Sequence, residues 1–210
     1  EHKSRFTGWM LLSRNKPVTT NSPLVQQDIN VVDESDSGYM LDQIRGFEIE
    51  KINDEEIRSY WVSAANNDSI FVTLDLEEPM DVRAVQINVQ DFNSQIFGRP
   101  DTLRQQFVIE GSRDGKNWDV LADYSKNTKD MPHAFVELSK AAIVRYVRYR
   151  HVYCSTRYLS ISELRVFGKG KGQAPVRPQS FKVDRQEDRR DAKLSWDASP
   201  GAQGYVVYWG

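Results

Sequence analysis

Alternation of apolar and polar positions dominates the middle of the chain. In residues 70–76 every second side chain is apolar, and residues 85–89 repeat the pattern. A two-residue period is that of a β-strand with one buried face. Further strand-like segments follow at 107–111, 118–121, 134–138, 144–150 and 161–167. The pattern predicts an all-β protein, built as a β-sandwich or jelly roll of short antiparallel strands.

Turn chemistry supports this prediction. Asp114 and Gly115 lie between two strand-like segments, which is a strong hairpin signal. A helical period is weak throughout: residues 42–57 allow a helical turn, but Gly46 and the mixed periodicity oppose a longer helix. The glycine-rich stretch before Pro175 has the composition of a linker. Three more strand-like segments follow it, at 181–183, 192–196 and 205–209.

Composition and charge exclude several classes of function. The 210 residues carry a formal net charge of −2, so no strong field favours binding to a phosphate backbone, and nucleic acid is not an expected partner. No apolar stretch reaches the length of a membrane span, and the first residues lack the apolar segment of a signal peptide. Cys154 is the only cysteine, which excludes an internal disulfide and a cysteine-clustered zinc site.

Six short motifs, in order and at the right spacing, resemble the F5/8 type C (discoidin-like, galactose-binding-like) domain. They occupy residues 15–19, 54–61, 71–76, 108–118, 145–148 and 161–168. Their likeness is to the version appended to bacterial glycoside hydrolases, and the tail resembles the first half of a fibronectin type III domain. The resemblance implies a discoidin-like β-sandwich or jelly roll followed by an incomplete fibronectin type III-like β segment.

The same resemblance implies a domain organisation. Residues 1–14 are expected to lead in from a preceding catalytic domain, and residues 15–168 to form the F5/8 type C domain. Residues 169–176 are then the linker, and 177–210 the truncated fibronectin type III domain. The segment 24–50 is longer and more acidic than the family's usual loop and could cover the usual binding face. Because half a sandwich leaves an apolar face open, the tail is expected to pack on a neighbour, to pack on the first domain, or to be poorly ordered.

Domains of this kind often hold one structural calcium ion. The resemblance implies that Asp54, Glu56 and Ser59 offer oxygen ligands from one loop and that Glu163 reaches over from the last strand. A hard cation of this type takes six to eight oxygen ligands, including backbone carbonyls. The alternative is that these residues cap turns and pair with arginine side chains.

A sugar-binding face is expected in two loops at one end of the sandwich, because sugar recognition needs aromatic platforms and planar or charged hydrogen-bonding groups. The candidate residues are Phe92, Asn93, Phe97, Arg99, His151, Tyr153, Arg157 and Tyr158. The alternative is that the aromatic rings only cover the ends of the core. Trp61 and Trp118 are expected to be structural.

Catalytic signals are weak. His151 and Cys154 are three residues apart, but such a pair needs an orienting third group and a pocket. Together with these weak signals, the resemblance implies a noncatalytic carbohydrate-binding or accessory module of a larger secreted glycoside hydrolase, holding the enzyme on polysaccharide. The alternative is a structural spacer that packs on the catalytic domain of the same parent chain. Adhesion to protein or phospholipid ranks third. The expected location is secreted, periplasmic or at a bacterial cell surface.

Overall fold

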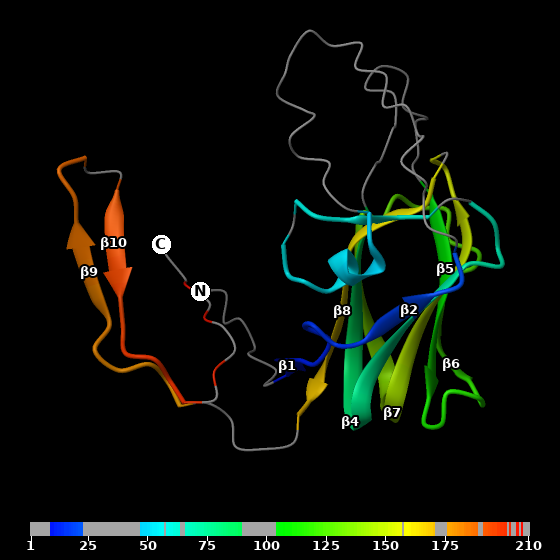
Figure 1. Cartoon of the computed structure of the whole chain (residues 1–210), viewed down its shortest axis with the longest axis horizontal. Helices are drawn as coiled ribbons and strands as arrows, with labels where there is room; N and C mark the ends of the chain where they lie inside the picture. Colours follow the sequence, from blue (N-terminus) through cyan, green and yellow to red (C-terminus); the bar gives the residue numbers. More distant parts are fainter. Residues whose placement is uncertain are drawn as a thin grey trace, which may run out of the picture. The chain divides into compact units, whose positions relative to one another are not determined.

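Residues 9–22, 47–56, 58–63, 66–89, 104–156, 158–170, 176–188, 191–200, 202, 205 and 207 are described by the computed structural model. The chain divides into two units, residues 1–170 and residues 171–210 (Figure 1). This division falls within the stretch expected to be a linker. In the described ranges no helix has the length and apolarity that crossing a membrane requires.

Unit 1 is built from antiparallel strands. Among the described residues they are β1 (Met10–Leu11), β2 (Val18–Thr20), β3 (Trp61–Val62), β4 (Phe71–Val89), β5 (Gln105–Ser112), β6 (Asp119–Asp123), β7 (His133–Cys154) and β8 (Ser160–Lys169), accompanied by the 3-10 helix η2 (Ile49–Ile52). The pairing order is β1-β8-β4-β7-β5-β6, while β2 pairs with β4 and β3 with β8. The all-β prediction is confirmed, and the hairpin at Asp114-Gly115 joins β5 to β6. The prediction is wrong in one respect. The segments expected as separate strands at 70–76 and 85–89 form the single strand β4, and those at 134–138 and 144–150 form β7.

These two long strands make the sandwich because each contributes to both layers. The first part of β4 pairs with the end of β7, and its second part pairs with the start of β7, with a register shift between Asp75 and Met80. At this corner Glu77 has a φ of 69° and its backbone N–H donates to the Asp75 carboxylate. Beyond the corner β4 gains β8 as its second neighbour. One layer thus contains β2, β5 and β6, and the other contains β1, β3 and β8.

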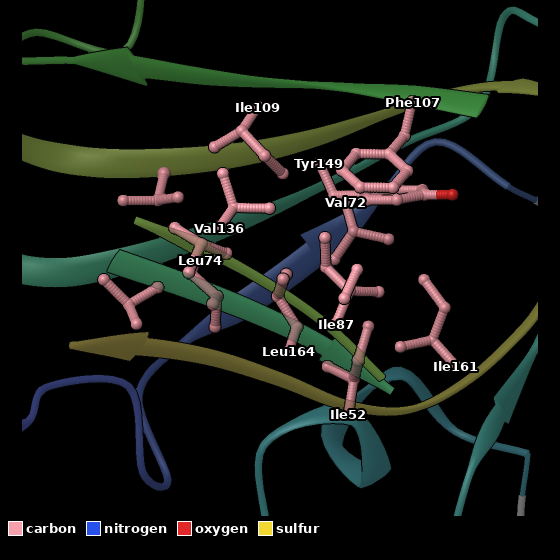
Figure 2. Packing of buried hydrophobic residues seen from close by; sticks show 14 of the residues in the cluster. Ile52, Val72, Leu74, Ile87, Phe107, Ile109, Val136, Tyr149, Ile161 and Leu164 are labelled. Carbon is pink, nitrogen blue, oxygen red and sulfur yellow. The ribbon is translucent and has the colours of Figure 1, made fainter. Parts of the chain in front are cut away.

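The core lies between the layers. Figure 2 shows Val72, Leu74, Phe107 and Ile109 from one layer pointing toward Ile87, Ile161 and Leu164 from the other, with Ile52 of η2 closing one side. All are at most 1% exposed. The two-residue period therefore located the buried face correctly.

Both tryptophans expected to be structural are packed into unit 1. Trp61 is 1% exposed. Trp118 is half-buried, and the guanidinium carbon of Arg148 lies 3.5 Å from its ring centroid and 4.5 Å from that of Phe71. Arg148 therefore stacks the β5–β6 hairpin on the outer face of β4 and β7.

Unit 2 contains the antiparallel strands β9 (Lys182–Arg185) and β10 (Ala192–Ser195). Trp196 packs its ring against Phe181 and Tyr205, with centroid separations of 6.3 and 5.2 Å. Of the third expected strand the structure describes only Tyr205 and Val207, and neither lies in a strand.

Candidate functional site

The end of β7 and the turn after it carry the described part of the expected sugar face. Tyr153 is 43% exposed, and Tyr158 is half-buried. The backbone N–H of Ser155 donates to the Arg104 carbonyl (3.1 Å), and the Arg104 N–H donates to Ser155 Oγ (2.9 Å). Arg104 is the first described residue after the segment that holds the other expected sugar-binding side chains. The expected residues Phe92, Asn93, Phe97, Arg99 and Arg157 lie outside the described residues.

His151 corrects the sequence prediction. It was expected to bind sugar hydroxyls, but its side chain is 0% exposed, and both ring nitrogens already have partners within the protein. Nδ1 lies 3.1 Å from the Tyr149 hydroxyl, and Nε2 lies 2.8 Å from Asn66 Oδ1. Burial lowers the pKa of His151 to about 4, so the ring is neutral near pH 7. The pattern that suggested a ligand residue instead marks an inward-facing position of β7.

Asn66 is a residue that the sequence did not single out. Its Nδ2 donates to the carbonyls of Cys154 (3.1 Å) and Thr156 (2.7 Å), while its Oδ1 faces His151. The partners are 85 to 90 positions away in sequence. No local spacing signals such a contact, because only the paired strands bring these segments together.

The pair of His151 and Cys154 does not form a nucleophilic site. Cys154 is 2% exposed, and burial raises the pKa of its thiol, which disfavours the reactive thiolate. Its sulfur instead lies near the carbonyls of Thr156 and Tyr158, at 3.7 and 3.8 Å. Both ring nitrogens of His151 are occupied elsewhere. The arrangement supports the turn rather than proton transfer.

The acidic loop before β3 forms a compact oxygen cluster. Ser59 Oγ donates to both carboxylate oxygens of Asp54, at 2.9 and 2.8 Å, and the Glu56 N–H donates to Asp54 Oδ1. Glu56 itself is exposed and accepts a hydrogen bond from the Arg58 N–H. The structure thus brings Asp54 and Ser59 together, as expected, but leaves Glu56 at the surface.

Glu55, and not Glu56, is the carboxylate associated with Glu163. Arg165 Nε lies 3.0 Å from Glu55 Oε1 and 3.9 Å from Glu163 Oε2, so one guanidinium faces both acids. Glu55 reaches this place from a backbone with a φ of 65°, in the left-handed region that non-glycine residues rarely adopt. The role of Glu56 as a calcium ligand stays a prediction.

Glu163 is the unusual group of this region. Its side chain is fully buried, and among the described residues neither carboxylate oxygen has a hydrogen-bond partner. Burial, reinforced by the negative charge of Glu55, raises its pKa to about 8. In the described ranges no three His, Cys, Asp or Glu side chains converge on one point. The donors that are present, two carboxylates, a hydroxyl and loop carbonyls, are the oxygen ligands that a hard cation prefers, and they do not suit a soft metal that binds thiolate.

The geometry defines a class of protein: an all-β sandwich with two very long shared strands and its polar loops gathered beyond the strand ends. The sequence profile of the F5/8 type C domain matches residues 33–164. The chain belongs to the F5/8 type C domain family. A search of curated protein sequences found no match.

Solved structures share this fold. Chitosan-binding module 2 of a chitosanase/glucanase from Paenibacillus sp. IK-5, in complex with chitotriose, is 18% identical with a TM-score of 0.54; the match covers 75% of this chain and 99% of that one. The Clostridium perfringens module CpGH89CBM32-4, in complex with GlcNAc-α-1,4-galactose, is 16% identical with a TM-score of 0.52, over 76% and 94% of the two chains. A family 89 glycoside hydrolase from Clostridium perfringens is 17% identical with a TM-score of 0.52, over 79% of this chain and only 15% of that enzyme. At these identities the likeness shows the fold alone.

Proposed function

We propose that this chain is a noncatalytic carbohydrate-binding module that holds a larger glycoside hydrolase on its polysaccharide. The observation that carries the proposal is the F5/8 type C sandwich itself, shared with modules solved in complex with chitotriose and with a disaccharide. Tethering raises the local concentration of enzyme, so even a weak single site is useful. The match to 15% of a family 89 hydrolase supports a place within a larger enzyme.

The ligand face is proposed at the end of β7 and the turn that follows it. Tyr153 offers an exposed aromatic ring, on which the apolar face of a sugar can stack. Tyr158 lies in the turn, Arg157 precedes it in sequence, and the Ser155–Arg104 hydrogen bonds tie the turn to the residue that follows the segment carrying Phe92, Asn93, Phe97 and Arg99 in sequence.

The test is binding of the full chain to an immobilised panel of plant and host glycans. One glycan class is expected to retain the chain, and Tyr153→Ala is expected to weaken its affinity about tenfold, because a stacked ring contributes on the order of 1 kcal/mol or more. Tyr205→Ala is the matched control, since Tyr205 is 40% exposed but lies in unit 2. If the folded chain is retained by none of the glycans, it is instead a structural spacer.

A structural calcium ion is proposed between the acidic loop and β8. Asp54, Ser59 and Glu163 would hold it, together with loop carbonyls, and the ion would neutralise the buried Glu163 carboxylate. The support is that this carboxylate is buried without a hydrogen-bond partner in the described structure, which is costly unless a cation or proton compensates it.

Calcium is expected to raise the melting temperature of the wild-type chain. At a concentration 100-fold above Kd the stabilisation is about 2.7 kcal/mol. Glu163→Gln is expected to abolish this rise, and in chelator above pH 8, where the buried carboxylate would be ionised, to melt above wild type because it removes that charge. Glu137→Gln, at an exposed position of β7, is the control and should respond as wild type. An equal calcium response in Glu163→Gln would exclude this ligand set.

The rest of the proposed organisation extends beyond unit 1. Residues 1–14 are proposed as the lead-in from a catalytic domain, and residues 177–210 as the first part of a fibronectin type III domain. The aromatic packing around Trp196 and the β9–β10 pairing support the latter. A module acting on polysaccharide would be secreted, periplasmic or displayed on a bacterial surface.

A further inference from the structure

A chain of hydrogen bonds runs from the core of unit 1 to the turn after β7. It begins at the Tyr149 hydroxyl, passes through both ring nitrogens of His151, and continues to Asn66 Oδ1. The amide nitrogen of Asn66 then donates to the carbonyls of Cys154 and Thr156. Four side-chain hydrogen bonds thus connect a rigid strand to an irregular turn.

The two hydrogen bonds that Asn66 donates to backbone carbonyls determine which atom is the donor in the other two. Only the NH2 group of an asparagine can donate, and in Asn66 it faces two carbonyls, so its Oδ1 faces His151 as an acceptor. The Nε2 atom of His151 must therefore carry a hydrogen, and in the neutral ring Nδ1 accepts from the Tyr149 hydroxyl. One tautomer satisfies every group in the chain.

The inner end of this chain is firmly placed. His151 pairs with Phe107 of β5, and its backbone N–H donates to the Ile70 carbonyl at 2.9 Å. The turn that it reaches carries no strand pairing of its own after Cys154. Buried or half-buried carbonyls need hydrogen-bond donors. At Cys154 and Thr156 the amide of Asn66 is such a donor, in place of a backbone N–H from a neighbouring strand.

We propose that Asn66 is a positioning residue for the ligand face: through its contact with the buried His151 it holds the turn at Cys154 and Thr156 in the shape that presents Tyr158 beside Tyr153, which β7 itself places. The proposal rests on the proposed sugar-binding function of this face. Asn66 does not itself touch the ligand. Its effect is to order the turn before the sugar arrives, which lowers the entropy cost of binding.

If Asn66 served only the general stability of the fold, its substitution would have different measurable effects. Removing any half-buried hydrogen-bonding side chain lowers the melting temperature. A positioning role additionally predicts loss of affinity at a preserved fold, and loosening confined to the turn. The chain contains a matched control, because Asn53 also donates its amide to two backbone carbonyls, those of Ser13 (2.8 Å) and Lys16 (2.9 Å), in another loop.

The experiment compares Asn66→Ala, Asn66→Asp and Asn53→Ala in the full chain with saturating calcium. Glycan affinity, melting temperature and amide hydrogen exchange at residues 154–158 are measured for each, together with the imidazole nitrogen shifts of His151. Asn66→Ala is expected to lower affinity about tenfold, to accelerate exchange in the turn and to lose the single-tautomer signature. Asn66→Asp keeps the acceptor but loses both donors, so it should be at least as impaired. Asn53→Ala should lose stability while keeping affinity and turn exchange.

Two results would overturn the proposal. One is affinity of Asn66→Ala within twofold of wild type; the other is turn exchange no faster than in Asn53→Ala. If the wild-type chain binds no glycan, the proposed function fails, and the exchange comparison alone decides whether Asn66 positions the turn.

Discussion

At the scale of single residues, polar groups inside unit 1 are held by specific partners. His151 is joined to Tyr149 and Asn66, and Asn53 is joined to the loop at residues 13–16. Among the described side chains of unit 1, only the carboxylate of Glu163 is buried without a hydrogen-bond partner. Buried groups of this kind make stability depend on pH, because folding changes their affinity for protons.

His151 should make the fold sensitive to acid. Its pKa is lowered to about 4 from the usual 6.5, so between these values the unfolded chain binds a proton that the folded chain does not. The free energy of unfolding is therefore expected to fall by roughly 3 kcal/mol as the pH drops from 7 to 4. His151→Gln should lack this part of the decline in urea titrations at several pH values.

The control for this prediction is His133→Gln, since His133 is exposed at the start of β7. It should keep the wild-type dependence. Identical slopes for wild type and His151→Gln would show that the imidazole is not the group responsible.

At the scale of elements, β4 and β8 meet at a close approach that only glycine allows. Gly168 pairs with Val82 beside the register shift at residues 82–84. A Cβ atom at Gly168 would lie 2.0 Å from the Asp81 carbonyl oxygen, a backbone atom that cannot move without disturbing the strand. Gly170 is different, because the nearest atom to its Cβ would be Met10 Sδ, at 2.9 Å, on a flexible side chain.

Gly168→Ala is therefore expected to destabilise unit 1 by about 3 kcal/mol, at the upper end of the cost of overpacking. Gly170→Ala should cost less than about 1 kcal/mol, since the methionine can shift. Urea unfolding of both variants measures the difference. Equal losses would mean that the β4–β8 pairing adapts more easily than the close contact indicates.

At the scale of the whole molecule, the two units differ in how much core they contain. The buried cluster of unit 1 draws on both layers of its sandwich and on η2. The described part of unit 2 has one pair of strands, with Phe181 and Val183 more than half exposed. A single two-stranded hairpin is at best marginally stable in water.

Residues 1–170 are accordingly expected to fold alone, with a melting temperature within about 2 °C of the full chain, as small changes outside a core shift stability little. Residues 171–210 alone should show no cooperative transition by calorimetry. A cooperative transition in the isolated segment, or a large loss of stability in residues 1–170, would contradict this division of the core.

The sequence by itself determined the all-β class, the buried face of each strand, the hairpin at Asp114-Gly115 and the resemblance to F5/8 type C domains. These features are local, because strand periodicity and turn chemistry act over a few residues. Tertiary structure decided that four expected strands form two long ones, since the corner at Glu77 keeps pairing on both sides of the bend. It also decided that His151 is buried, that Asn66 contacts it, and that Glu55 rather than Glu56 accompanies Glu163. Those outcomes depend on which segments the sheet brings together across 85 to 110 positions of sequence, a separation at which residue spacing carries no information.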